Sequence, residues 1–114
     1  MKFTVIITSA PYGKERAYSA LRFALTSLLE GAEVNIFLIE DGVYVAKKGQ
    51  NPSEVPNYLE LLKNAIELGA VVKVCGPCCK ARGLSDSDLI EGVKLATMHD
   101  LVAFVKESDN VITF

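Results

Sequence analysis

Apolar residues in this chain fall into short uninterrupted runs that alternate with longer stretches of helical spacing. Residues 3–8 form a β-branched, nearly continuous apolar run, which is typical of a strand buried on both faces of a parallel sheet. Similar short runs predict further strands, and apolar residues that recur every three or four positions predict helices between them. The predicted strands are residues 3–8, 33–39, 70–74, 93–96 and 111–114, and the predicted helices are residues 14–30, 57–68 and 98–107.

Two pairs of polar residues mark helix starts in the second half of the chain. Ser85 with Asp88, and Thr97 with Asp100, resemble capping boxes in which Asp replaces the usual Glu. The helix that begins at Ser85 is expected to be short because a glycine follows it. Residues 93–96 are therefore interpreted as a fourth strand rather than as a continuation of that helix.

The longest irregular section covers residues 42–56, which contain a glycine near their middle and two prolines beyond it. A short extended piece is predicted within it, at residues 43–45. A loop of this length in a small domain is usually functional or forms an interaction surface. Tyr44, Val55 and Tyr58 are candidates for a subunit interface, although packing in the core explains them equally well.

Alternation of strands and helices at these spacings predicts a single domain, residues 1–114, with a three-layer α/β/α architecture and a parallel sheet. Sheets of this kind place their binding and catalytic sites at the carboxyl ends of the strands. Three segments then become neighbours at that edge: residues 9–13, 40–42 and 75–83. The third segment contains every cysteine of the chain, so the fold is expected to place the thiols where such sheets have their sites.

Composition narrows the classes of function. The chain has 114 residues, half of them apolar, and a formal net charge of −2. That charge gives no reason to expect a nucleic-acid partner, and no apolar run approaches the length of a membrane span. The start of the sequence does not match an export signal. We therefore expect a cytoplasmic protein whose three cysteines are free or only transiently paired.

Cys75 and Cys78 have the spacing of a C-x-x-C pair directly after the third predicted strand. A thiolate is the reactive form of cysteine, and backbone N–H groups at a helix start and nearby cations favour it. Lys80 and Arg82 are the cations closest in sequence. The first hypothesis is nucleophilic sulfur chemistry in which Cys78 resolves whatever Cys75 carries.

Three other interpretations of the cysteines stay open. Residues 75–78 have the same four letters as the thioredoxin active site, but the chain has no Trp and no proline after Pro77. A metal site would combine Cys75, Cys78 and Cys79 with His99, a ligand set unlike the usual structural zinc patterns. The cysteines are otherwise small buried hydrophobes, which suits Cys79 best.

Other polar residues at the predicted strand ends are candidates for lining the same site. Ser9, Tyr12 and Lys14 lie at the first strand–helix turn. The N-terminus of a helix is a common binding position for anions. The glycine-rich fingerprints of phosphate binding are absent from the sequence. Asp41 and Gly42 follow the second strand, and this dipeptide is more often a turn than a catalytic site.

The order of these features resembles the DsrE/DsrF-like family, which includes the TusD-type sulfur relay proteins. The matching features are the Asp-Gly-Val of residues 41–43, a cysteine that ends the third strand (Cys75), and the Arg-Gly of residues 82–83. The chain also closes on a short strand after a helix, and the resemblance covers essentially its whole length. Each motif is short, so the order and spacing of the motifs identify the family.

The resemblance implies a parallel five-stranded sheet between helices and assembly into homotrimers or hexamers. It also implies that Cys75 accepts sulfane sulfur as a persulfide and passes it from a donor protein to an acceptor protein, without a cofactor. Cys78 matches the second cysteine of family members with C-x-x-C, and Cys79 matches no family position. A non-catalytic, oligomeric ligand-binding or scaffold protein of the same fold is the main alternative. A dithiol redox protein that uses Cys75 and Cys78 is the third.

Overall fold

Five strands form one sheet in the order β4-β3-β2-β1-β5, and every neighbouring pair is parallel. The structure is a computed structural model that describes residues 1–54 and 56–114. The predicted parallel five-stranded sheet is therefore confirmed. The strands are β1 (Lys2–Ile7), β2 (Glu33–Leu38), β3 (Val71–Cys75), β4 (Val93–Ala96) and β5 (Asn110–Thr113), and the helices are α1 (Arg16–Leu29), α2 (Tyr58–Glu67), α3 (Gly76–Ala81) and α4 (Met98–Glu107), with 3-10 helices η1 (Glu40–Ala46) and η2 (Asp86–Asp88).

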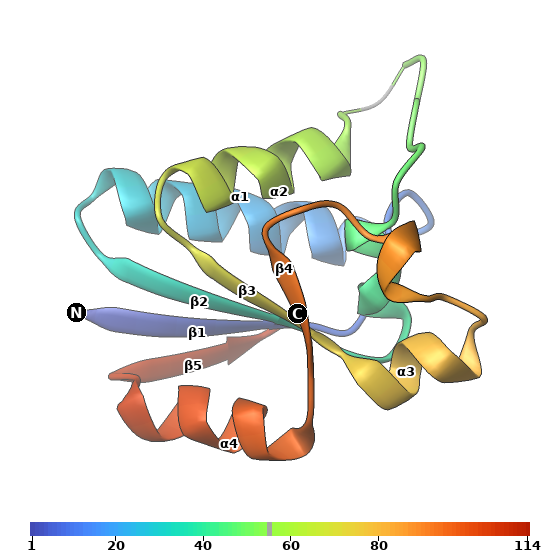
Figure 1. The fold of residues 1–114 in the computed structure, drawn as a ribbon. Helices are drawn as coiled ribbons and strands as arrows, with labels where there is room; N and C mark the ends of the chain where they lie inside the picture. Colours follow the sequence, from blue (N-terminus) through green and yellow to red (C-terminus); the bar gives the residue numbers. More distant parts are fainter. Residues whose placement is uncertain (55) are drawn as a thin grey trace.

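Helices cover both faces of the sheet. Helices α1 and α2 lie side by side on one face, and α4 lies on the other (Figure 1). The face of α1 that meets the sheet carries small residues and one leucine at helical spacing, so the helix packs closely against β1 and β2. Those buried apolar residues are Ala17, Ala20, Leu21 and Ala24. The predicted three-layer architecture follows from this arrangement.

The second half of the chain follows the predicted capping pattern. Ser85 and Asp88 form a complete capping box, but the helix that they start is only the short 3-10 helix η2. Thr97 and Asp100 form a second complete box at the start of α4. Residues 93–96 pair with β3 as β4, as the sequence indicated.

The extended piece predicted at residues 43–45 is wrong, because these residues lie within η1. Val43 and Val45 are both buried, so their alternation with Tyr44 looks like a strand in the sequence. A strand directly after β2 has no free position beside β2 to occupy, since β2 is already paired with β1 on one side and β3 on the other. The 3-10 turns bury both valines instead, against the ends of the strands. Val55, a candidate interface residue, lies outside the described residues.

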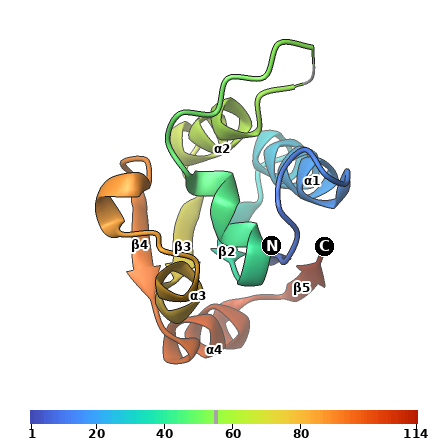
Figure 2. The same cartoon turned by 90° about the vertical axis from the view of Figure 1, so that its right-hand side faces the viewer.

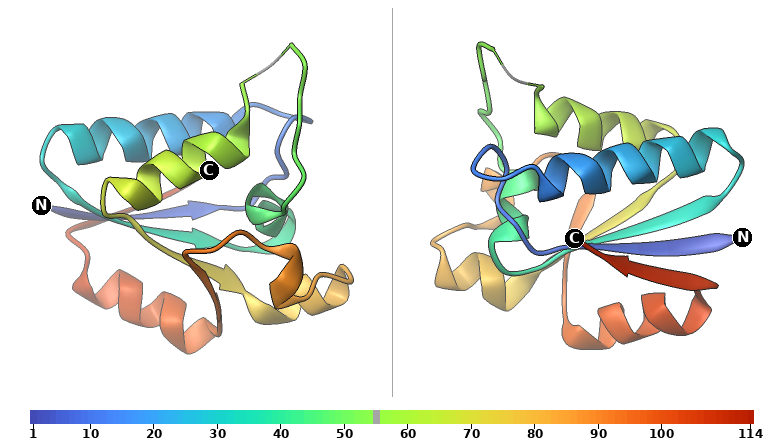
Figure 3. Two further views of the ribbon diagram at one scale, coloured as in Figure 1. Left: turned by 45° about the horizontal axis from the view of Figure 1, so that its top comes forward. Right: turned by 180° about the vertical axis from the view of Figure 1, so that it is seen from behind.

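The carboxyl ends of the strands meet at one end of the molecule. Figure 2 looks onto that end, where α3 and η1 lie next to each other in front of the sheet. The chain after η1 extends away from the body before it returns to the start of α2 (Figure 3). In the part of the chain that the structure describes, no helix has the length and apolar character needed to cross a membrane.

Candidate active site around the cysteine pair

The turn from β3 into α3 is tight because of the two residues that follow Cys75. A Cβ added at Gly76 would lie 3.3 Å from the carbonyl oxygen of Ala96, which ends β4. Pro77 occupies the first turn of α3, where its missing N–H costs no helical hydrogen bond. The chain therefore passes directly from the strand into the helix. Cys75 is the last residue of β3, and Cys78 lies in the first turn of α3.

Cys75 and Cys78 are paired as a disulfide, with their Cα atoms 5.2 Å apart. The backbone N–H of Cys78 also donates a hydrogen bond to Sγ of Cys75 over 3.2 Å. Both cysteines are partly buried rather than enclosed in the core. Since the α3 turn brings the two sulfurs together, this C-x-x-C sequence is able to cycle between dithiol and disulfide.

A second backbone donor reaches the pair from the loop after β2, residues 39–42, which include the start of η1. The N–H of Glu40 donates to Sγ of Cys78 over 3.2 Å. Glu40 has a φ of 55°, in the left-handed region that residues with a Cβ seldom adopt. Such strain persists only where surrounding contacts hold the backbone in place, and it is often found at functional sites. The left-handed backbone at Glu40 therefore directs its N–H toward the Cys78 sulfur.

Gly42 provides one of those contacts. A Cβ at this position would overlap the carbonyl oxygen of Ile7, the last residue of β1. The same carbonyl accepts a hydrogen bond from the N–H of Ile39 over 3.0 Å, and the Gly42 N–H donates to the Ile39 carbonyl over 2.9 Å. The loop after β2 is thus fixed directly onto the end of β1, and only glycine fits there.

Arg82 links the loop after β2 to the cysteine helix. Its Nε and Nη2 each lie 3.0 Å from Oδ1 of Asp41, and its Nη1 donates to the carbonyl oxygen of Cys78 over 3.1 Å. One guanidinium therefore binds both Asp41, which follows Glu40, and Cys78, whose sulfur accepts the Glu40 N–H. Arg82 is suited to this role because its planar fork offers donors in several fixed directions.

The remaining sulfur is separate from this arrangement. Cys79 is 1% exposed and belongs to the main hydrophobic core. Burial raises the pKa of its thiol, and the charge of Arg82 offsets this only in part. The interpretation of Cys79 as a small buried hydrophobe agrees with this position.

The other predicted site residues do not all gather at the sulfurs. Lys80 is exposed on α3. Ser9 and Asp41 line a pocket of about 300 Å³, together with Thr8 and Lys14. The structure thus brings Arg82, and Asp41 through it, to Cys78, whereas Gly42 lies against the end of β1 and Ser9 lines a pocket that shares Asp41.

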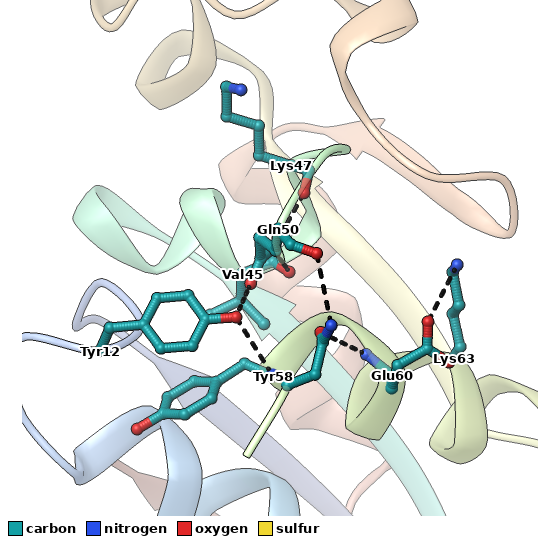
Figure 4. Close-up of polar contacts among 8 residues, drawn as sticks. Tyr12, Val45, Lys47, Gln50, Tyr58, Glu60 and Lys63 are labelled. Carbon is teal, nitrogen blue, oxygen red and sulfur yellow. Dashed lines mark hydrogen bonds and ion pairs between the residues drawn. The ribbon is translucent and has the colours of Figure 1, made fainter. Parts of the chain in front are cut away.

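Tyr12 lies in another environment, shown in Figure 4. Its ring packs against the ring of Tyr58 with centroids 4.6 Å apart, and its hydroxyl donates to Oε1 of Gln50 over 2.7 Å. These contacts join the first strand–helix turn to the loop before α2. Tyr12 therefore holds the loop before α2 and has no recorded contact with the cysteine pair.

Sequence reasoning missed Glu40 as a functional residue. Its contribution is a backbone N–H in a left-handed conformation, and a Glu side chain gives no sign of either in the sequence. The Asp41–Arg82 pair had a detectable sign, because opposite charges at two neighbouring strand ends are expected to meet.

The metal hypothesis finds no support in the described residues, where no group of three or more His, Cys, Asp or Glu side chains is placed to hold an ion. His99 is exposed in the first turn of α4, whereas Cys79 is in the core. The set of Cys75, Cys78, Cys79 and His99 is not assembled in this fold.

Comparison with known proteins adds family information to this geometry. A family model described as the DsrE/DsrF-like family matches residues 1–114. Protein MJ0989 of Methanocaldococcus jannaschii is 90% identical over the full length of both chains, and YchN of Escherichia coli is 32% identical over 99% of this chain and 98% of its own. Sulfurtransferase TusD of Cronobacter sakazakii is 27% identical over all of both chains. The crystal structure of the E. coli YchN protein superposes with a TM-score of 0.92 and covers 100% of both chains.

Proposed function

Because the chain belongs to the DsrE/DsrF-like family, we propose that it is a sulfur carrier that accepts sulfane sulfur as a persulfide on Cys75 and relays it to a partner protein. The sulfur comes from a donor protein, and the reaction belongs to cytoplasmic sulfur metabolism. The distant similarity to a protein named sulfurtransferase TusD supports the choice of chemistry.

The observation that carries the proposal is the position of the Cys75 sulfur. It lies at the carboxyl end of an inner strand, is partly buried, and accepts the N–H of Cys78. An N–H donor to this atom lowers the free energy of the Cys75 thiolate relative to the thiol. Lys80 and Arg82 are proposed to add positive potential around the same atoms, although the guanidinium of Arg82 is directed to Asp41 and a carbonyl.

The proposal includes assembly into a homotrimer or hexamer. An apolar stripe on the outer face of α4 supports self-association, because Met98, Val102 and Val105 recur at helical spacing and are 61%, 48% and 40% exposed. Sedimentation of the purified protein measures the subunit number directly.

Mass spectrometry of the intact protein tests the carrier function. The reduced protein is incubated with a persulfide donor, desalted, and weighed beside Cys75→Ser and Cys79→Ser. Wild type and Cys79→Ser are expected to react with the donor, either gaining one sulfur or ending as the disulfide, whereas Cys75→Ser gains none. A gain of one sulfur by Cys75→Ser, or no reaction of Cys79→Ser with the donor, would exclude Cys75 as the acceptor.

The pairing of Cys75 with Cys78 favours a second candidate, a dithiol–disulfide redox protein. This function predicts that the pair reduces disulfides of other proteins, such as insulin, without any sulfane sulfur donor. Measurement of the reduction potential of the pair, together with insulin reduction by wild type and Cys75→Ser, separates it from a carrier.

A further inference from the structure

The geometry points to a second activity of the same site, which rests on the proposed persulfide: Cys78 displaces the sulfane sulfur from Cys75 as hydrogen sulfide and leaves the Cys75–Cys78 disulfide. The carrier then has two outcomes for its cargo. A partner thiol removes the sulfur in relay, whereas Cys78 releases it as sulfide when no partner is bound.

The position of the two sulfurs decides which atom Cys78 attacks. Sγ of Cys75 and Sγ of Cys78 are joined directly in the structure. In a persulfide the Cys75 Sγ is the inner sulfur, so Cys78 is placed to bond to that atom. Attack on the outer sulfur would instead move the sulfane sulfur to Cys78 and would require a third sulfur between the two. The observed pair has the same connectivity as the product of attack on the inner sulfur.

Contacts from the protein also position Cys78 and favour its role as a nucleophile. Its Sγ accepts the N–H of Glu40, a donor from a different strand end. Its carbonyl oxygen is held by Arg82, and Arg82 holds Asp41 beside Glu40. The segment after β2 therefore reaches Cys78 twice, directly through the Glu40 N–H and through the Asp41–Arg82 ion pair at the end of α3. A hydrogen-bond donor at Sγ favours the thiolate that thiol exchange needs.

The reaction balances without an external oxidant. The electron pair of the Cys78 thiolate forms a bond to Sγ of Cys75, and the bond between Sγ of Cys75 and the outer sulfur breaks. That outer sulfur leaves with the bonding pair as HS⁻ and is reduced by two electrons. The two cysteine sulfurs supply these electrons as they become a disulfide. A dithiol reductant afterwards returns two electrons and two protons to the pair and is itself oxidised to a disulfide.

Persulfide loading under anaerobic conditions, with sulfide and intact mass measured together, tests this activity. The reduced wild type, Cys78→Ser and Cys79→Ser are treated with a polysulfide donor and desalted, and released sulfide is trapped with monobromobimane. Wild type and Cys79→Ser are expected to release one sulfide per chain and to end two hydrogens lighter than the dithiol. Cys78→Ser is expected to keep the extra sulfur and to release sulfide only after a thiol is added.

The outcomes separate the two proposals. Retention of the persulfide by wild type for as long as by Cys78→Ser overturns the sulfide release and leaves the carrier function standing. If Cys78→Ser gains no sulfur on Cys75 while its circular dichroism matches that of wild type, both proposals are wrong. Cys78→Ala repeats the experiment if the serine variant does not fold, and equal sulfide release by that variant and wild type also overturns the inference.

Discussion

Gly42 lies so close to the carbonyl oxygen of Ile7 that no side chain fits between them. This contact joins the loop after β2 to the end of β1 and fixes the backbone that presents the Glu40 N–H to Cys78. The position of a sulfur is therefore determined by a backbone contact made two strands away from the cysteines.

Gly42→Ala is expected to destabilise the fold by about 3 kcal/mol or more, because the added methyl group overlaps backbone that cannot move without displacing β1. Urea denaturation measures the free energy of unfolding. Gly13→Ala is the matched control, since an added Cβ there meets nothing within 4 Å and the residue lies outside the left-handed region. Equal stability of the two variants would contradict the close approach.

Arg82→Gln is expected to affect the chemistry of the pair more than the stability of the fold. Asp41 is largely exposed, so the ion pair contributes less than about 1 kcal/mol to stability. Loss of the guanidinium releases both Asp41 and the Cys78 carbonyl, and misplaced reacting atoms slow a reaction by about tenfold or more. The rate of Cys75–Cys78 disulfide closure is the measurement. Lys94→Gln, an exposed charge on β4, serves as control, and equal rates in both variants would argue against a positioning role for Arg82.

Gln50→Ala is expected to loosen the loop between η1 and α2. The Gln50 amide donates to the carbonyl oxygens of Val45 and Lys47, each over 2.9 Å, and accepts the Tyr12 hydroxyl. Since each such bond contributes on the order of 1 kcal/mol, faster amide exchange is expected at residues 47–54, with stability lower by about 1–2 kcal/mol. Asn51→Ala, at an exposed neighbouring position, is expected to stay within about 0.5 kcal/mol of wild type.

Alkylation of the reduced native protein is expected to separate the three thiols into two classes. Cys75 and Cys78 are partly buried and react first, whereas Cys79 is 1% exposed and its pKa is raised by burial, so little thiolate is available. In denaturant all three react alike. Labelling of Cys79 in the native protein as fast as Cys75 would show that the core is open at this position.

Acid is expected to weaken the start of α4. The Thr97 N–H and then Lys73 hold the pKa of the Asp100 carboxyl below its ordinary value. A carboxyl whose pKa is lower in the folded state stabilises the fold above its unfolded pKa, and this stabilisation is lost as the pH falls below about 4. The stability difference between wild type and Asp100→Asn should therefore shrink from pH 7 to pH 3. A difference that stays constant would mean that the carboxylate charge is not involved.

Much of the fold was predictable because its determinants are local. The buried run of residues 3–8, the capping pair of Thr97 and Asp100, and the short fourth strand all depend on neighbours in sequence. The strand predicted at residues 43–45 is wrong because its outcome depends on non-local contacts. Their alternation fits a strand, but both sides of β2 are already occupied, and only the assembled sheet shows this. A local pattern specifies which side chains are buried, not whether a sheet edge is free.

The sequence by itself determined that a C-x-x-C pair follows a strand of a parallel sheet, because apolar runs fix the strands and parallel sheets place their carboxyl ends together. Tertiary structure alone decided what each sulfur contacts. The Glu40 N–H at Cys78, the Arg82 bridge to Asp41 and the burial of Cys79 arise from segments far apart in the chain. Hydrogen bonds and burial depend on distances in space, and these exist only after the strands have paired and the loop after β2 has packed against β1.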